Sequence, residues 1–258
     1  MQNLKSKLKK SLHPSLFAFL KFIWNKDAIA FINFFKDRHI PLPLNEKLRI
    51  LRRLYSISTH VDSPHTQTEI LSYMTAILKI PTGVEGKIIE AGCFKGSSTA
   101  KFSIAVSKVH RELIVLDSFE GIPLNDEPHE KTIFGDGASF KQGDFCGKLS
   151  EVTSNVEKFG DISCCRFIKG WFDDSLPDFK EKIAAVYIDV DLASSTKTCL
   201  KYLYPLLISG GVLYSQDGHL PLVVDVFNDD EFWEKEVGYK KPLIEGLNVR
   251  KLIKITKQ

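Results

Sequence analysis

The chain has 258 residues and a formal net charge of +3, with 43% hydrophobic and 26% charged residues. This composition is ordinary for a globular protein with one large domain, or one domain plus a helical extension. The small net charge argues against nucleic acid as a partner. The five cysteines, an odd number with no Cys-x-x-Cys pair, argue against a disulfide framework and favour a cytoplasmic location.

The first 40 residues are predicted to form two helices. In the first, Leu4, Leu8, Leu12 and Leu16 recur at helical spacing with lysines between them. Two placements fit this basic amphipathic start: the surface of an anionic membrane, or packing on the domain or on a partner subunit in a homodimer. The apolar run 16–24 is too short to span a bilayer, and no small-residue cleavage site follows it.

Further helices are expected before residue 80. An apolar run over 28–35 needs burial, and Pro41 and Pro43 break the chain after it. Asn45 is predicted to cap the next helix, and another helix is expected over 66–78 with Thr66 or Thr68 near its start. Residues 1–80 are therefore predicted to form a helical extension or lid, followed by a domain over 81–258.

From residue 87 the pattern alternates between short apolar strands and amphipathic helices. This pattern predicts an α/β fold with a mostly parallel sheet covered by helices on both faces. Ligands of such sheets bind beyond the carboxyl ends of the strands. The irregular stretch 118–147 is predicted to be a functional lid or disordered. The expected strands are 87–91, 112–116, 165–168, 184–189 and 211–215, and the expected helices between them are 97–108, 149–159, 176–182 and 195–207.

A glycine-containing turn follows the first of these strands. It reads Glu90-x-Gly92-x-x-x-Gly96-Ser97, which is not the Gly-x-Gly-x-x-Gly spacing of a dinucleotide site. Gly92 lets the backbone approach a ligand closely, and Glu90 can accept a hydrogen bond from a cationic amine. Asp117 ends the second strand, where a carboxylate is placed to bind both hydroxyls of a ribose. Each of these interpretations has an alternative. The glycine motif could be a tight turn that binds no ligand, and Asp117 could cap a helix.

Acidic residues also follow the fourth and fifth strands. Asp189 and Asp191 are two apart and share a face of the chain, and Gln216 and Asp217 come after the next strand. Several carboxylates together require a cation or protons to neutralise them. An oxygen-rich site of this kind suits Mg²⁺, although some of these acids could instead cap helices.

Five motifs in this order resemble the macrocin O-methyltransferase family, which belongs to the class I S-adenosylmethionine-dependent methyltransferases. They begin at Glu90, Leu116, Lys169, Tyr187 and Ser209: Glu-x-Gly-x-x-x-Gly-Ser, Leu-Asp-Ser-Phe-Glu-Gly-Ile-Pro, Lys-Gly-Trp-Phe-Asp-Asp-Ser-Leu-Pro, Tyr-Ile-Asp-Val-Asp-Leu and Ser-Gly-Gly-Val-Leu. The resemblance covers about residues 80–255. It implies a Rossmann-like, seven-stranded sheet completed by antiparallel strands, and Mg²⁺-assisted methylation of a sugar hydroxyl.

The resemblance also implies roles for individual residues. Asp189 and Asp217 would bind the metal, with Gln216 as a further oxygen ligand. Asp191 would be the general base. His219 stands where the family commonly has an aromatic residue, and this histidine is predicted to contact the substrate or to share the base role. The acceptor would be a small-molecule sugar or glycoside. The S-adenosylmethionine site would include Asp189 together with Glu90, Gly92, Phe94, Gly96, Ser97, Asp117, Ser118, Gly170 and Trp171.

One position departs from the family pattern. Two adjacent acids commonly follow the fifth strand in the family, whereas the first of them is Gln216 here. An amide oxygen can ligate a hard cation but brings no charge, so metal binding is expected to be weaker or lost. The alternatives to a metal-assisted enzyme are a metal-independent N- or O-methyltransferase of another small molecule, and a non-catalytic module tethered to a membrane or a complex.

Overall fold

The computed structural model describes residues 27–258. The predicted amphipathic helix and its contacts with a membrane or a partner subunit lie outside the described residues. Within the described part, no helix combines the length and the apolar character needed to cross a bilayer.

A seven-stranded sheet forms the centre of the domain, in the order β3-β2-β1-β4-β5-β7-β6. The first five strands pair in parallel, and the last two are joined by antiparallel pairing, β5 with β7 and β7 with β6. This is the sheet that the family resemblance implies, and the α/β Rossmann-like prediction is confirmed. The strands are β1 (Lys87–Ala91), β2 (Leu113–Asp117), β3 (Cys165–Lys169), β4 (Ile183–Ile188), β5 (Leu207–Ser215), β6 (Ile244–Glu245) and β7 (Ile253–Thr256).

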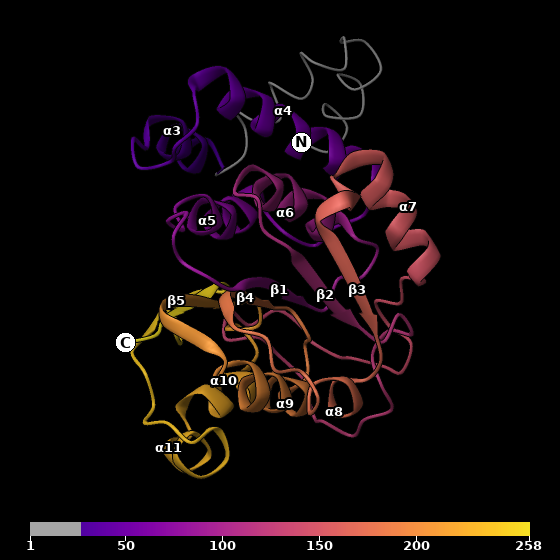
Figure 1. The fold of residues 1–258 in the computed structure, drawn as a ribbon. Coiled ribbons are helices and arrows are strands. Elements are labelled where there is room, and N and C mark those ends of the chain that lie inside the picture. The colour runs from indigo at the N-terminus through magenta and orange to yellow at the C-terminus, as the bar shows by residue number, and fades with distance from the viewer. Residues whose placement is uncertain (1–26) are drawn as a thin grey trace.

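Helices cover both faces of the sheet, which explains why its central strands are continuous apolar runs (Figure 1). All six residues of β4 are buried. One face carries α5 (Gln67–Leu78), α6 (Ser97–Lys108) and α7 (Leu149–Phe159), and the other carries α8 (Phe172–Ser175), α9 (Ala193–Leu203) and α10 (Pro221–Asn228). Each face has its own hydrophobic cluster.

Three helices of the predicted N-terminal extension pack on the first of these faces. The helices α3 (Ala28–Lys36) and α4 (Leu44–His60) form an outer layer over α5 and α6 (Figure 1). Residues of all three share one hydrophobic cluster with β1, β2 and β4. Thr66 caps α5 in a reciprocal capping box with Glu69. The predicted cap at Asn45 is wrong, because α4 begins at Leu44 with Pro43 as its N-cap, and Asn45 lies inside the first turn.

The predicted helix over 176–182 is also wrong. The short helix α8 ends at Ser175, and the chain then crosses to β4 without another helix. Pro177 accounts for this, since a helix usually ends at or before the residue preceding a proline. Leu176 and Phe179 lie in a non-helical segment. They are buried in the hydrophobic cluster on the face that carries α8, α9 and α10.

The C-terminal segment completes the sheet. After α10 come α11 (Asp230–Phe232), a π-helical turn η2 (Trp233–Val237) and the antiparallel strands β6 and β7. Trp233 is fully buried and donates its indole N–H to the carbonyl of Phe227. Trp233 is therefore a packing residue of the core.

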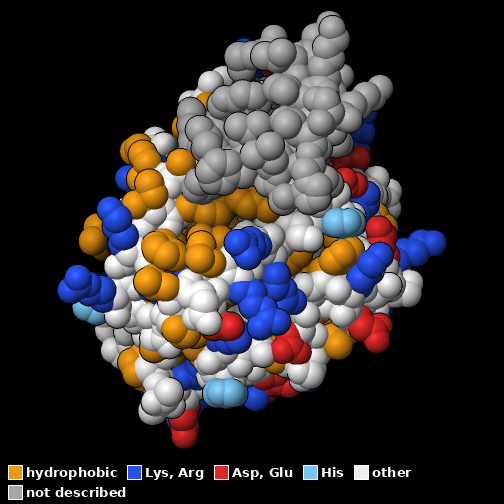
Figure 2. Space-filling view, turned by 90° about the horizontal axis from the view of Figure 1, so that it is seen from above, with side chains coloured by type: hydrophobic (Ala, Val, Ile, Leu, Met, Phe, Trp, Pro, Cys, Tyr) orange, Lys and Arg blue, Asp and Glu red, His pale blue; other side chains and the backbone are white. Residues whose placement is uncertain are grey.

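The outer helices expose apolar side chains. Figure 2 shows hydrophobic side chains on the face of the molecule seen from above. Among the exposed residues are Ile29 and Ile32 of α3 and Leu44 and Leu48 of α4. No partner chain is present, so the homodimer stays a prediction.

Candidate active site

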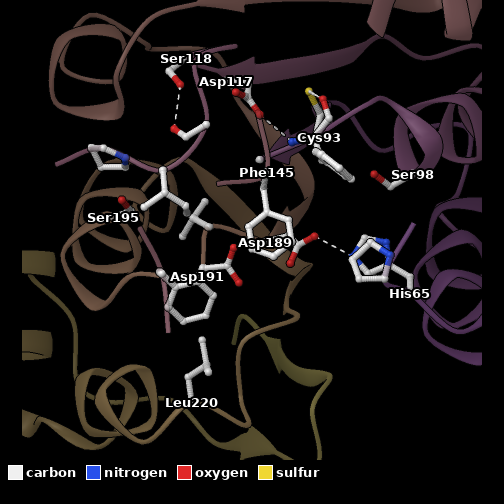
Figure 3. A pocket seen from close by; sticks show the side chains of 18 of the residues that line it. His65, Cys93, Ser98, Asp117, Ser118, Phe145, Asp189, Asp191, Ser195 and Leu220 are labelled. Carbon is white, nitrogen blue, oxygen red and sulfur yellow. Dashed lines mark hydrogen bonds and ion pairs between the residues drawn. The ribbon is translucent and has the colours of Figure 1, made fainter. Parts of the chain in front are cut away.

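A cavity of about 320 Å³ lies at the carboxyl ends of the parallel strands (Figure 3). Its walls come from the turns after β1, β2, β3, β4 and β5, from the irregular stretch 118–147, and from the segment 62–65 between α4 and α5. Of the predicted site residues, the ones that line it are Gly92, Phe94, Ser97, Asp117, Ser118, Gly170, Trp171, Asp189, Asp191 and His219.

Gly92 shapes the turn between β1 and α6. Its φ is +84°, and a Cβ at this position would lie 1.9 Å from the backbone oxygen of Asp189. Only glycine fits this contact, which brings the backbone of Asp189 against the turn. Gly96 is the N-cap of α6 and does not line the cavity. The requirement for Gly92 therefore comes from the close approach of two chain segments.

Asp117 connects the turns after β1 and β2. Its Oδ2 accepts a hydrogen bond from the backbone N–H of Cys93 at 2.7 Å, and its Oδ1 accepts one from Phe119 at 2.7 Å. Burial raises the pKa of this carboxyl group, although these two bonds oppose the effect. The carboxylate lines the cavity beside Ser118, with an aromatic wall from Trp171 and Phe172 after β3.

Glu90 is fully buried and does not line the cavity. Burial raises the pKa of its carboxyl group to about 8. The side chain therefore lies behind the cavity wall, and direct contact with a cationic amine, as the sequence predicted, does not fit this position.

Asp189, Asp191 and Asp217 converge at the carboxyl ends of β4 and β5. Each offers one carboxylate oxygen, and these three oxygens lie within 4.8 Å of one another. Oδ2 of Asp217 accepts hydrogen bonds from the backbone N–H groups of Val190 and Asp191, at 2.9 and 3.1 Å. Its buried Oδ1 has no hydrogen-bond partner among the described residues. Three converging carboxylates with one oxygen left unpaired form a donor set that fits a hard cation such as Mg²⁺.

The three carboxyl groups have different acidities. Burial and then the neighbouring charges of Asp217 and Asp189 hold the pKa of Asp191 well above its usual range. Burial also raises the pKa of Asp217, to about 7. For Asp189, burial acts in the same direction, but the adjacent His65 together with Lys251 and His219 outweighs it, and the pKa is lowered. The cluster thus carries less negative charge than three independent carboxylates, and Asp189 is its most acidic member.

Gln216 does not belong to this donor set. Its side chain is fully buried outside the cavity lining, and its amide oxygen accepts a hydrogen bond from the Tyr187 hydroxyl at 2.8 Å. The amide thus points into the core rather than toward the carboxylates. The structure contradicts the prediction that Gln216 is a metal ligand, because its oxygen already has a buried donor.

His219 lines the cavity beside Lys251. Burial, followed by the nearby charge of Lys251, lowers the pKa of His219 to about 4. The imidazole is therefore neutral at pH 7 and a weak proton acceptor. The position agrees with a substrate contact better than with a shared base role.

The irregular stretch 118–147 closes one side of the cavity and has few regular elements of its own. Glu127 fastens it to α9, because its carboxylate accepts hydrogen bonds from the backbone N–H groups of Ala193 and Ser194, at 2.8 and 2.9 Å. His129 lies 3.0 Å from the same carboxylate. The backbone N–H of Ile133 donates to the carbonyl of His219. These bonds hold the stretch against the cavity, in the position that a lid would occupy.

Sequence reasoning missed several cavity residues. The most consequential is His65, whose Nε2 lies 2.7 Å from Oδ2 of Asp189 although 124 positions separate them in the chain. Lys251 reaches the cavity from the segment before β7, and Phe145 from the lid. No motif marks these positions. The one local signal near His65 is the capping motif at Thr66, which predicts where α5 begins and thus where the segment that carries His65 ends.

The sheet order and a cavity at the carboxyl ends of its parallel strands define a class I methyltransferase fold. Among solved structures, the O-methyltransferase NovP superposes with a TM-score of 0.59 at 24% identity, covering 76% of this chain and 83% of NovP. The calicheamicin methyltransferase CalS11 superposes with a TM-score of 0.58 at 18% identity, covering 85% and 95%. These similarities establish the fold.

The macrocin-O-methyltransferase family profile matches residues 70–243, and the chain belongs to this family. One relative is the 8-demethyl-8-(2,3-dimethoxy-alpha-L-rhamnosyl)-tetracenomycin-C 4'-O-methyltransferase of Streptomyces olivaceus, 30% identical over 63% of each protein. Another is the mycinamicin III 3''-O-methyltransferase of Micromonospora griseorubida, 29% identical over 54% of this chain and 58% of the relative. The matched region thus spans less than two thirds of either relative.

Proposed function

We propose that this protein is an S-adenosylmethionine-dependent O-methyltransferase that methylates a sugar hydroxyl with the assistance of Mg²⁺. The observation that carries the proposal is the convergence of Asp189 and Asp191, which line the cavity, with the buried Asp217 behind them. The relatives support the substrate class, since one is named for 4'-O-methylation of a rhamnosyl tetracenomycin and another for 3''-O-methylation of mycinamicin III.

The donor site would lie along the carboxyl ends of β1, β2 and β3. Asp117 would bind the ribose hydroxyls, and the aromatic wall of Trp171 and Phe172 would contact the adenine. Phe94 and Ser97 would contact the methionine part of the cofactor. S-adenosylmethionine would supply a methyl group on a positively charged sulfur, which leaves as a neutral thioether.

The acceptor hydroxyl would bind at the acid cluster. An alcohol is a poor nucleophile at neutral pH, so the site must orient it in line with the methyl group and remove its proton. Asp189 and Asp217 would hold Mg²⁺, which would lower the pKa of the bound hydroxyl. Asp191 would take the proton, because it lines the cavity and has no side-chain hydrogen bond within the described residues.

A metal-independent methyltransferase is the second candidate. The orientation of Gln216 toward Tyr187 favours it, because this leaves the site with one oxygen ligand fewer than the family pattern offers. Such an enzyme would use Asp191 without a bound cation and would accept an amine or a hydroxyl group.

A methyl-transfer screen distinguishes the two candidates. Nucleotide sugars, glycosides and small amines are offered with labelled S-adenosylmethionine, with Mg²⁺ or with EDTA. We expect an O-methylated sugar whose formation stops with EDTA and resumes when Mg²⁺ is restored. Transfer that is insensitive to EDTA, or that goes to nitrogen, would contradict the metal-assisted proposal.

A further inference from the structure

The segment that joins α4 to α5 brings a histidine to the acid cluster. The imidazole Nε2 of His65 lies 2.7 Å from Oδ2 of Asp189, and its side chain is only 4% exposed. Figure 3 shows His65 on the side of Asp189 that faces away from Asp191. Nothing in the family motifs assigns this residue a role, and it comes from the helical N-terminal part of the chain.

Several contacts fix His65 in this place. The next residue, Thr66, is the N-cap of α5, so the backbone direction is set where the helix begins. Asp62 forms an ion pair of 2.7 Å with Lys95 in the turn after β1. The imidazole also packs edge-on against the Tyr187 ring, with centroids 6.1 Å apart and planes at 83°. The histidine is therefore held from its own segment and from β4.

The hydrogen bonds around the ring indicate which nitrogen carries the proton. Ser63 Oγ accepts from the backbone N–H of His65 at 3.3 Å and lies 3.4 Å from Nδ1. An ionised carboxylate oxygen can only accept a hydrogen bond, so the 2.7 Å contact with Asp189 requires the proton to be on the imidazole. Nε2 then carries the ring proton and donates it to Oδ2 of Asp189.

Asp189 and Asp217 are oriented in the same way. Each has one carboxylate oxygen held by protein donors: Oδ2 of Asp189 by His65, and Oδ2 of Asp217 by two backbone N–H groups. The second oxygen of each has no such bond within the described residues. Asp191 differs, because neither of its oxygens has a hydrogen bond there. The two oriented carboxylates are suited to ligation, and the unrestrained one is suited to proton transfer.

We propose that His65 is a positioning residue that turns Asp189 so that its Oδ1 serves as a metal ligand. This inference rests on the proposed Mg²⁺ site and deepens it. Hydrogen bonds from outside the ligand set typically fix a ligand's orientation, and their loss costs about 10–100-fold in metal affinity. It also means that the metal site is complete only when the α4–α5 segment is docked on the sheet.

The test compares two substitutions in the full-length protein. His65→Leu keeps much of the side-chain volume but removes the donor, whereas His65→Gln keeps an N–H donor at a similar reach. His60→Leu, at the exposed end of α4 and outside the cavity lining, is the matched control. Mn²⁺ replaces Mg²⁺ and its binding is followed by electron paramagnetic resonance. Calorimetry with S-adenosylhomocysteine reports separately on the methyl-donor site.

We expect Mn²⁺ affinity to fall about 10–100-fold in His65→Leu and to recover at least in part in His65→Gln. S-adenosylhomocysteine should bind all three variants, and His60→Leu should bind both ligands like the wild type. Unchanged Mn²⁺ affinity in a folded His65→Leu protein, or an equal loss in both His65 variants, would overturn the inference. Wild-type protein that binds S-adenosylhomocysteine but no Mn²⁺ would overturn it too, while the methyltransferase proposal would stand.

A measurement on the wild-type protein decides the matter even if His65→Leu fails to fold. Nitrogen-15 spectra of labelled histidine distinguish the two ring tautomers. We expect His65 in the Nε2–H form, with its resonances shifted when Mg²⁺ is added. An Nδ1–H tautomer, or no response to Mg²⁺, would contradict a donor role toward Asp189.

Discussion

Asp217 holds the backbone of Asp191 through a hydrogen bond from the Asp191 N–H to its Oδ2, 3.1 Å long. Asp191 has a φ of +61°, a left-handed conformation that costs a residue other than glycine about 1 kcal/mol or more. A second bond, from Val190 to the same oxygen, reinforces the turn. One carboxylate thus stabilises the conformation that places another in the cavity, and the proposed metal ligand also positions the proposed base.

Asp191→Asn is expected to abolish methyl transfer and to leave cofactor binding intact. The amide has nearly the same shape but cannot take up a proton from the acceptor hydroxyl. Loss of a general base typically lowers the rate by about 100–10,000-fold. Turnover is measured with an identified acceptor, and binding of S-adenosylhomocysteine by calorimetry. A variant with normal turnover would show that Asp191 is not the base.

Asp217→Asn is expected to weaken metal binding by at least about 10-fold. The amide oxygen can still accept from Val190 and Asp191, so the turn should survive. The amide nitrogen would replace the unpaired Oδ1, and it cannot ligate a cation. Mn²⁺ titration of the variant measures the effect, with Asp229→Asn, at the cap of α11, as a control. Equal Mn²⁺ affinity in wild type and Asp217→Asn would remove Asp217 from the ligand set.

Glu127→Ala is expected to loosen the lid over the cavity. The substitution removes the acceptor for the first N–H groups of α9, a loss that typically costs about 1 kcal/mol. We expect a higher KM for the acceptor and a smaller change in affinity for S-adenosylhomocysteine. Glu130→Ala, on the same stretch but exposed and without a side-chain bond to α9, is the control. If both variants behaved alike, the bond to α9 would not be what orders the lid.

Glu90→Gln is expected to change how stability depends on pH. The pKa of Glu90 is about 8 in the folded protein against 4.5 in the unfolded chain, so the folded state binds more protons between these values. Wild-type stability should therefore fall as pH rises from 5 to 8, by up to about 1.4 kcal/mol per pH unit from this group. The neutral amide removes this contribution.

Urea unfolding of cofactor-free wild type and Glu90→Gln at pH 6 and pH 8 checks this expectation. The variant should gain stability relative to the wild type at the higher pH. If the two proteins differed in free energy of unfolding by the same amount at both pH values, Glu90 would not be protonated in the folded state.

The fold could be predicted well because its central strands, β1, β2 and β4, are buried on both faces. The first two helices after β1 and β2, over 97–108 and 149–159, have the predicted bounds, and β1 does as well. Periodicity failed where few residues are buried. Over 176–182 only Leu176 and Phe179 are buried, and Pro177 favoured a turn over a helix.

The site could be predicted only where its residues follow strands. Asp117, Asp189, Asp191 and Asp217 meet because parallel strands end at one edge of the sheet. The direction of a side chain was not predictable in the same way, since Gln216 neighbours Asp217 but bonds to Tyr187 in the core. The contact of His65 with Asp189 could not be predicted from the sequence. It depends on how the N-terminal helices dock on the sheet, and no local pattern encodes that docking.

The central claim is that the carboxyl ends of β1 and β2 bind the methyl donor. Calorimetric titration of the purified full-length protein with S-adenosylhomocysteine tests it directly, with Asp117→Ala as the comparison. We expect saturable binding at one site per chain, weakened by at least about 10-fold in Asp117→Ala because the ribose would lose a charged acceptor. No binding to the wild type, or equal binding to both proteins, would contradict it.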